Sequence, residues 1–153
     1  MMLVVEVKLN DVWVIFNPDN HHQDNYLPRG FWDTDRNYLG FNFLNPDIRP
    51  SARGRARTPY KSIPVKGFPR DVSDEVADLL RIDRDDPSHF GLDLEICPSW
   101  ATLKEILDRG DIPRTIYHDH VTVLGRTTAY LREYADEKGL PYEAVRLIYY
   151  FSQ

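Results

Sequence analysis

Apolar and polar residues alternate at both ends of the chain, and this pattern predicts strands there. Residues 3–9 and 12–16 are rich in β-branched and aromatic side chains, as strands with a buried face usually are. Asn10-Asp11 between them has the chemistry of a tight turn, so the two strands are expected to form an opening hairpin. Residues 144–151 are another β-rich run, and we expect this run to pair with the hairpin.

Apolar residues at helical spacing predict four helices between these strands. They cover residues 31–43, the stretch after Ser73, the stretch after Thr102 and residues 125–138. Asp33 or Thr34 is expected to cap the first helix. Ser73 is a preferred N-cap residue, and Thr102 with Glu105 forms a capping box.

The remaining segments complete the predicted fold. Leucine and isoleucine alternate with other residues over 91–97, which favours a further strand. Residues 45–69 hold five prolines and are expected to form a long extended connection at the surface. This order predicts one α+β domain over residues 1–153. Its antiparallel sheet would consist of the N-terminal hairpin and the C-terminal strand, with helices packed on one face. A long basic loop would extend from this domain.

Charge is distributed unevenly along the chain. The net charge is −5, yet residues 48–70 contain seven basic residues and no acid. Residues 71–86 contain seven acids and two arginines. A basic arm followed by an acidic segment suggests an anionic ligand for the first and a partner surface for the second.

Composition limits the class of protein. Hydrophobic residues make up 42% and charged residues 28% of the chain, as in globular proteins. Cys97 is the single cysteine, so an internal disulfide and a thiolate zinc cluster are excluded. The first residues do not read as a signal peptide, and no apolar run approaches the length of a membrane span. We therefore expect a cytoplasmic protein without membrane partners and without a cofactor.

An aromatic and arginine-containing segment is the first candidate site. On a helix, Trp32 and Arg36 lie four residues apart on one face, so the guanidinium can stack on the indole. Together with Tyr38, they would form a pocket floor for a planar base and a phosphate. The alternative is an amphipathic helix on which Arg36 pairs with Asp33 or Asp35.

The basic arm supplies the second candidate site. In an extended chain, Arg53, Arg55 and Arg57 would point to one side, where they could converge on phosphates, with Tyr60 nearby to stack on a base. Nucleic acid could bind the same arm through release of counterions. The alternatives are a solvated loop and an arm neutralised by the acidic segment after Asp71.

Two histidines form a third, weaker candidate. In a strand, His118 and His120 point the same way and could hold a metal together with a carboxylate. Solvated or structural histidines are the alternative. The chain carries no phosphate loop, dinucleotide fingerprint, serine elbow or zincin helix, so no catalytic residue is assigned and binding is favoured over catalysis.

Four motifs in order resemble a group of proteins. In chain order they are W-x3-R-N-Y-x2-F from Trp32, G-F-P-x-D-V-S-x-E-V from Gly67, S-W-x-T-L-x-E from Ser99 and V-R-L-I-Y-Y-F from Val145. This order resembles small accessory proteins of bacteriophages and bacterial mobile elements, most of them without an assigned activity. The resemblance implies a phage-encoded protein that acts in the host cytoplasm.

These observations lead to a functional prediction. Arginines and aromatics without a nucleophile suggest a protein that binds a phosphate-bearing, nucleotide-like ligand. In a phage setting, such a protein would sequester a nucleotide immune signal of the host as an anti-defence sponge, for which a homo-oligomer is one possible form. The alternatives are an inhibitor that binds a host protein through the acidic segment, and a small metal-dependent phosphodiesterase at His118, Asp119 and His120.

Overall fold

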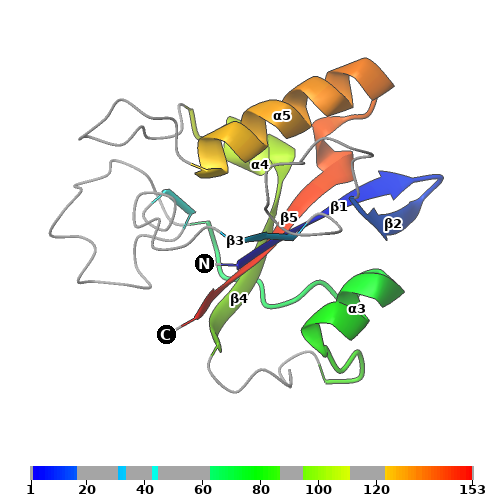
Figure 1. Cartoon of the computed structure of the whole chain (residues 1–153), viewed down its shortest axis with the longest axis vertical. Coiled ribbons are helices and arrows are strands. Elements are labelled where there is room, and N and C mark those ends of the chain that lie inside the picture. Colours follow the sequence, from blue (N-terminus) through cyan, green and yellow to red (C-terminus); the bar gives the residue numbers. More distant parts are fainter. Residues whose placement is uncertain are drawn as a thin grey trace, which may run out of the picture.

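A computed structural model of the chain describes residues 2–16, 31–33, 43–44, 63–86, 95–110 and 123–152. Its strands are β1 (Met2–Leu9), β2 (Val12–Ile15), β3 (Phe31–Asp33), β4 (Glu95–Thr102) and β5 (Val145–Ser152). Its helices are α3 (Asp74–Leu80), α4 (Leu103–Leu107), α5 (Val123–Lys138) and the 3-10 helix η1 (Tyr142–Ala144). Figure 1 shows these elements arranged around the central strands β1 and β5.

The strands form one antiparallel sheet in the order β2-β1-β5-β4. β1 pairs with β5 along one edge, while β2 and β3 pair with different parts of its other edge. The prediction that the C-terminal strand pairs with the opening hairpin is therefore confirmed. β5 lies between β1 and β4, so strands from the two ends of the chain form the centre of the sheet.

The turn of the hairpin explains why the chain reverses at residues 10 and 11. Asn10 and Asp11 have φ angles of 50° and 62°, in the left-handed region. Two consecutive residues of this kind are typical of the type I′ turns that match the twist of a two-stranded hairpin. Asn and Asp tolerate this region better than other residues with side chains, so this local sequence selects the turn.

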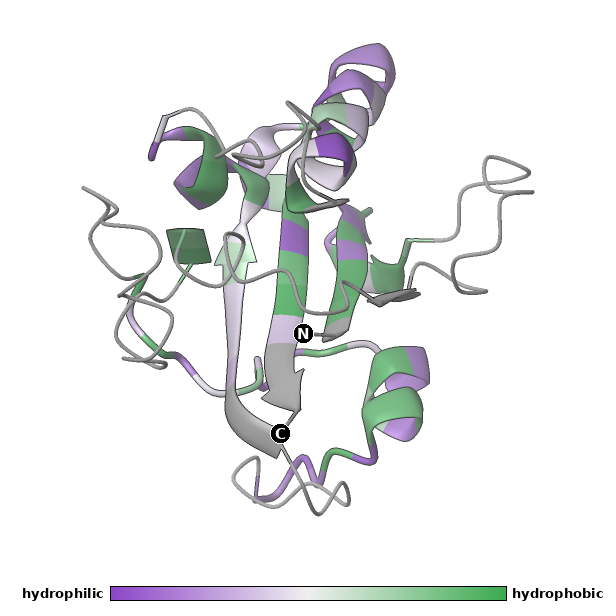
Figure 2. Cartoon of the chain, turned by 60° about the vertical axis from the view of Figure 1, so that its left-hand side comes forward, coloured by the Kyte–Doolittle hydropathy of each residue, from purple (hydrophilic) through white to green (hydrophobic). Residues whose placement is uncertain are grey.

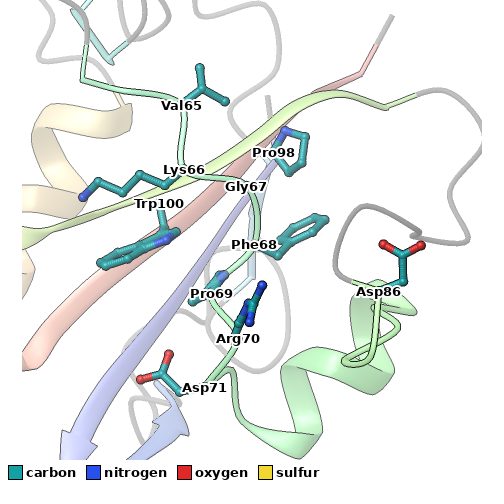
Figure 3. Close-up of a pocket in the computed structure, with 10 residues that line it drawn as sticks. All are labelled: Val65, Lys66, Gly67, Phe68, Pro69, Arg70, Asp71, Asp86, Pro98 and Trp100. Carbon is teal, nitrogen blue, oxygen red and sulfur yellow. The ribbon is translucent and has the colours of Figure 1, made fainter.

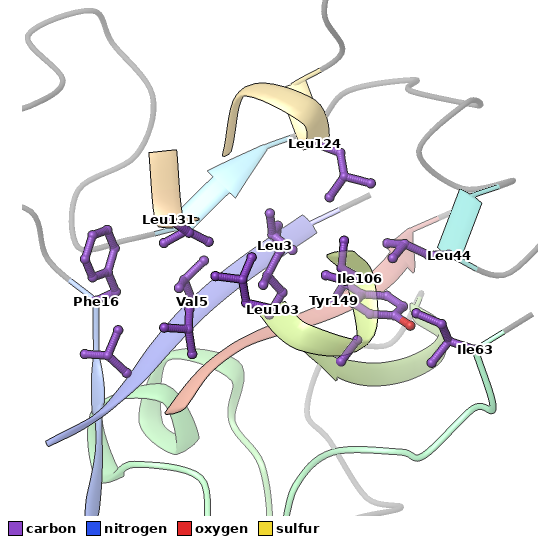
Figure 4. Close-up of a cluster of buried hydrophobic side chains, with 14 of the residues drawn as sticks. Leu3, Val5, Phe16, Leu44, Ile63, Leu103, Ile106, Leu124, Leu131 and Tyr149 are labelled. Carbon is purple, nitrogen blue, oxygen red and sulfur yellow. The ribbon is translucent and has the colours of Figure 1, made fainter. Parts of the chain in front are cut away.

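One face of the sheet is covered by α4 and α5. Leu3, Val5 and Val7 of β1 point into a core that includes Leu103 and Ile106 of α4 and Leu124 and Leu131 of α5. These side chains gather between the helices and the sheet (Figure 4). Fully burying a leucine or valine stabilises the fold by about 1.5–3 kcal/mol, so this core is the main source of stability.

The opposite face is covered by α3. Val4 of β1 and Ile148 of β5 pack against Val76 and Leu80 of this helix in a second core. Successive residues of a strand point to opposite faces, so Val4 and Val5 serve different cores. The α+β fold is confirmed, but helices cover both faces of the sheet in place of the single face that we expected. In Figure 2, both α3 and α5 contain hydrophobic and hydrophilic residues, as helices packed on a sheet usually do.

The capping residues set the helix boundaries as predicted. The Ser73 side chain accepts a hydrogen bond from the backbone of Val76 and starts α3. Thr102 and Glu105 form the predicted capping box at the start of α4. Gly139 follows α5 with a φ of 64°, a conformation that glycine adopts without strain.

Two predicted elements differ in the structure. Residues 31–33 form strand β3 in place of the first turn of a helix, because Trp32 pairs with Leu3 of β1. Pairing with an available edge outweighs weak helical spacing in so short a segment. Strand β4 begins at Glu95 and runs to Thr102, beyond the predicted end at Cys97. Pro98 lies within it, where the register with β5 shifts, and such an edge position tolerates the missing N–H.

The described helices give no support for a membrane span, since none combines the length and apolar character needed to cross a bilayer.

Candidate functional site

A buried ion pair lies in the middle of the α3 face. Glu6 of β1 and Arg146 of β5 stand opposite each other in the antiparallel register. Their side chains are 0% and 1% exposed, and Arg146 Nε donates to Glu6 Oε2 at 2.7 Å. Removing two charges from water costs several kcal/mol per ion, so this pair needs further hydrogen bonds to be tolerated.

Asp71 supplies part of this compensation. Arg146 Nη1 donates to Asp71 Oδ1 at 2.6 Å, and Trp13 Nε1 donates to Asp71 Oδ2 at 2.8 Å. Arg146 Nη2 also donates to the backbone carbonyl of Asp71 at 3.1 Å. Partial burial raises the pKa of Asp71, but the hydrogen bond and charge of Arg146 and the hydrogen bond of Trp13 outweigh it, so the net pKa lies below 3.8. Asp71 is therefore held as a carboxylate.

Two further contacts fix the orientation of this cluster. The Arg146 guanidinium lies over the Trp13 ring, 3.9 Å from its centroid, which is close enough for a cation–π interaction. Glu6 Oε1 accepts a hydrogen bond from the backbone N–H of Ser73, the residue that caps α3. We refer to Glu6, Trp13, Asp71 and Arg146 as the charge cluster. It ties α3 and the segment before it to three strands of the sheet.

Residues 63–72, which we call the strap, connect the two faces of the molecule. Ile63 belongs to the core under α4 and α5, whereas Phe68 and Val72 belong to the core under α3. The backbone N–H of Lys66 donates to Ser99 Oγ of the edge strand β4 at 3.1 Å. The strap thus passes the edge of the sheet at β4, which protects this edge from pairing with another chain.

A groove of about 920 Å³ lies between the strap, residues 98–100 of β4 and the turn after α3 (Figure 3). Most of its lining is apolar and comes from Val65, Gly67, Phe68, Pro69, Pro98 and Trp100. Lys66, Arg70, Asp71 and Asp86 supply the charged groups. The groove is open, and its apolar walls with a few charged groups can contact a ligand that has both an apolar and a charged part.

The two basic residues of the groove differ in their partners. Lys66 Nζ donates to both carboxylate oxygens of Glu105, at 2.6 and 2.8 Å, and lies 4.1 Å from the centroid of the Trp100 ring. Arg70 is exposed and forms no hydrogen bond or ion pair with any residue that the structure describes. Its guanidinium is the more available cation for an anionic ligand.

Glu105 holds Lys66 in place from α4. Partial burial raises its pKa, but hydrogen bonds from Lys66 and from the backbone of Thr102 outweigh this, so the net pKa of Glu105 lies below 4.5. The same carboxylate accepts from the Thr102 backbone N–H at 2.8 Å. The Glu105 carboxylate is therefore both a member of the α4 capping box and the partner of Lys66 at one end of the groove.

The described part of the chain shows no catalytic constellation. Tyr149 is buried near Ser99, and burial raises its pKa to about 12, so its phenol stays protonated and cannot act as a base near neutral pH. No group of three or more metal-binding side chains is found among the described residues.

The predicted site residues are only partly covered by the structure. Trp32 lies in strand β3, so the predicted helix is wrong at this residue. Its predicted contact with Arg36 lies outside the described residues. Six further residues of the predicted ligand site lie outside the described residues: Arg36, Tyr38, Arg53, Arg55, Arg57 and Tyr60. His118 and His120 also lie outside them.

The charge cluster and the groove were missed at the sequence level. One signal was present: Glu6 and Arg146 each interrupt an apolar run that predicts a buried strand. Charged residues are rarely fully buried unless they are paired, so two such interruptions suggest a pair. The contributions of Arg70, Asp71 and Trp100 depend on the path of the strap, which no local pattern reveals.

Comparison with known proteins adds no assignment. Neither the family models nor the curated proteins nor the solved structures compared with this chain gave a match. The resemblance to phage accessory proteins stays a prediction, and the function has to be argued from the groove and the charge cluster.

Proposed function

We propose that this protein binds a phosphate-bearing, nucleotide-like ligand in the groove between the strap and β4. The observation that carries the proposal is Arg70, an exposed guanidinium without a partner in the described part of the chain, at a largely apolar groove. A guanidinium binds phosphate through a planar, bidentate fork. An apolar lining that includes the Trp100 ring suits a planar base.

The backbone of the strap adds to the anion site. The N–H groups of Gly67 and Arg70 form no hydrogen bond with the residues that the structure describes. Gly67 has a φ of 71°, so the strap turns there in a conformation that suits glycine. Free N–H groups at such a turn can donate to phosphate oxygens together with Arg70.

Lys66 has a secondary role in this proposal. Its ammonium is already neutralised by Glu105, so a phosphate would have to share it. Glu105 keeps its hydrogen bonds with Thr102 when Lys66 moves, which lowers the cost of sharing. We assign Arg70 the larger share of the binding free energy and Lys66 the smaller.

The proposed cellular role comes from the resemblance to phage accessory proteins. A binding protein without a catalytic step would act by sequestration, and in a phage setting its ligand would be a nucleotide immune signal in the host cytoplasm. The arginines of the basic arm, Arg53, Arg55 and Arg57, would add phosphate contacts in this proposal.

The test is calorimetric titration and thermal shift with a panel of linear and cyclic nucleotides. A ligand that binds the folded state raises the melting temperature. Arg70→Ala should weaken binding by about 10- to 100-fold, because a hydrogen bond to a charged group contributes about 1.5–3 kcal/mol. Arg126→Ala is the matched control, since Arg126 is exposed on α5, which covers the other face of the sheet. Absence of any nucleotide binding, or equal effects of the two variants, would refute the proposal.

A second candidate is supported by the outer surface of α3. Leu79 is 45% exposed on this helix, next to the exposed acids Asp74, Glu75 and Asp78. An exposed apolar residue on a short helix that also carries acidic residues suits a small protein contact. If the protein inhibits a host factor through this surface, Leu79→Lys should abolish co-purification of that factor and leave nucleotide binding unchanged.

A further inference from the structure

The strap is attached to the rest of the molecule at three positions. Ile63 N–H donates to the carbonyl of Leu44 at 2.9 Å at its start. Lys66 contacts Ser99, Glu105 and Trp100 near its middle. Asp71 contacts Arg146 and Trp13 near its end. The groove residues Gly67, Phe68, Pro69 and Arg70 lie between the second and third positions.

The third position includes one exposed side chain. The Asp71 side chain is 65% exposed, while its partner Arg146 is 1% exposed and already bound to Glu6. The local turn adds little, because the hydrogen bond from Val72 N–H to the Pro69 carbonyl is 3.4 Å long. The backbone of this end is also held, because the Asp71 carbonyl accepts from Arg146 Nη2 at 3.1 Å and the Val72 carbonyl accepts from Arg84 Nη2 at 2.9 Å. The carboxylate of Asp71 adds the side-chain part of this anchor.

Loss of Asp71 should leave the buried ion pair intact. Glu6 binds Arg146 through Nε and Nη2, independently of Asp71. The buried guanidinium would therefore keep its counter-ion, and the sheet would keep its cross-strand pair. The consequence should be confined to the strap.

We infer that Asp71 is a positioning residue for the groove: its hydrogen bonds to Arg146 and Trp13 hold the strap on the sheet and thereby place the adjacent Arg70. The inference rests on the proposed function for its meaning, since the strap carries the ligand groove. Arg146 acts in this arrangement as the fixed point on the sheet, stacked on Trp13 and locked by Glu6.

Hydrogen exchange of the ligand-free protein, followed by mass spectrometry, tests the inference. The hydrogen-bonded amides of the strap, those of Lys66 and Val72, should exchange about fivefold faster in Asp71→Ala, because a largely exposed carboxylate makes a modest contribution to local closure. Peptides from β1, β5 and α5 should change little. Asp78→Ala is the matched control, since Asp78 is exposed on α3 and its side chain forms no hydrogen bond or ion pair with the residues that the structure describes. A uniform rise over all peptides, or no rise in the strap, would overturn the inference.

Acetate separates positioning from simple charge compensation. In Asp71→Ala, acetate can occupy the place between Arg146 and Trp13, but it cannot tether the strap. Strap peptides should therefore exchange equally fast in sodium acetate and in sodium chloride at the same ionic strength. Restoration of wild-type protection by acetate would show that only the negative charge matters, and would overturn the positioning role.

The result is independent of the ligand. A protein that binds no nucleotide in the panel, yet shows a released strap in Asp71→Ala, would refute the proposed function and leave the role of Asp71 standing. Nucleotide binding that survives in Asp71→Ala with unchanged affinity would overturn the role of Asp71 and leave the proposed function standing.

Discussion

Different interactions stabilise the packing on the two faces of the sheet. Under α4 and α5, the side chains from β1 and β5 are aliphatic or aromatic, and the core is continuous (Figure 4). Under α3, the apolar contacts are fewer, and a buried ion pair stands at the centre beside them. The face under α4 and α5 stabilises the fold by removing apolar surface from water. On the face under α3, each buried charge has to be paired, because an unpaired buried charge is costly.

This difference explains where the groove lies. Arg126 is an exposed cation on α5, but the groove on the α3 face takes its cations, Lys66 and Arg70, from the strap. On the α3 face, the strap crosses the sheet edge and is held by the side chains of Lys66 and Asp71, with apolar groove residues between them. A face held by specific hydrogen bonds is also a face that a few substitutions can alter.

The largest effect is expected for Arg146→Ala. It leaves Glu6 buried without its cation, which should reduce the free energy of unfolding by about 3–5 kcal/mol. Chemical denaturation with urea measures this value. The double variant Glu6→Leu with Arg146→Met replaces the pair by apolar side chains, and should recover most of the loss. If the double variant were as unstable as the single one, the loss would not come from the stranded carboxylate.

Next comes Leu131→Ala on the other face. Leu131 is fully buried in the core under α5, so a cavity should reduce the free energy of unfolding by about 2–5 kcal/mol. Leu79→Ala is the matched control, because Leu79 is 45% exposed on α3 and should change stability by less than about 0.5 kcal/mol. Equal losses in the two variants would contradict the assignment of the main core.

The pH dependence of Asp71 is a smaller effect. Its folded-state pKa is lowered, so its contribution is complete well above pH 3.8 and is lost as the pH falls through that value and below it. Because the side chain is largely exposed, we expect a contribution of about 1 kcal/mol after screening by solvent. The difference in unfolding free energy between wild type and Asp71→Asn, measured from neutral to acidic pH, should shrink toward zero as the solution becomes more acidic. A difference that grows with acidity would have the wrong sign.

The smallest effect is expected for Asp74→Ala. Asp74 pairs with Arg84 at the surface, and both side chains are largely exposed. Such pairs contribute about 0–1 kcal/mol, and the loss of a carboxylate from the first turn of α3 falls in the same range. Urea denaturation in low and high salt measures both contributions, which should diminish with salt. A loss as large as that of Arg146→Ala would remove the distinction between exposed and buried charges.

Local chemistry allowed part of this structure to be predicted. The capping box of Thr102 and Glu105, the N-cap Ser73 and the turn at Asn10-Asp11 act over a few residues, so their outcome is readable from neighbours in the chain. The segment at Trp32 was predicted as helix because its spacing is helical, but an edge of β1 was available to pair with it. Such pairing depends on a strand far away in the sequence.

The sequence by itself determined the opening hairpin, the helix starts and the α+β class, since these follow from the period of apolar residues and from turn and cap chemistry. Only the tertiary structure decided which face each helix covers, and that Glu6 and Arg146, 140 residues apart, share one buried pair. It also decided that the strap brings Arg70 and Trp100 to one groove. The physical reason is that burial and charge pairing depend on distances in space. The sheet register and the path of the strap set these distances, and no local sequence pattern contains them.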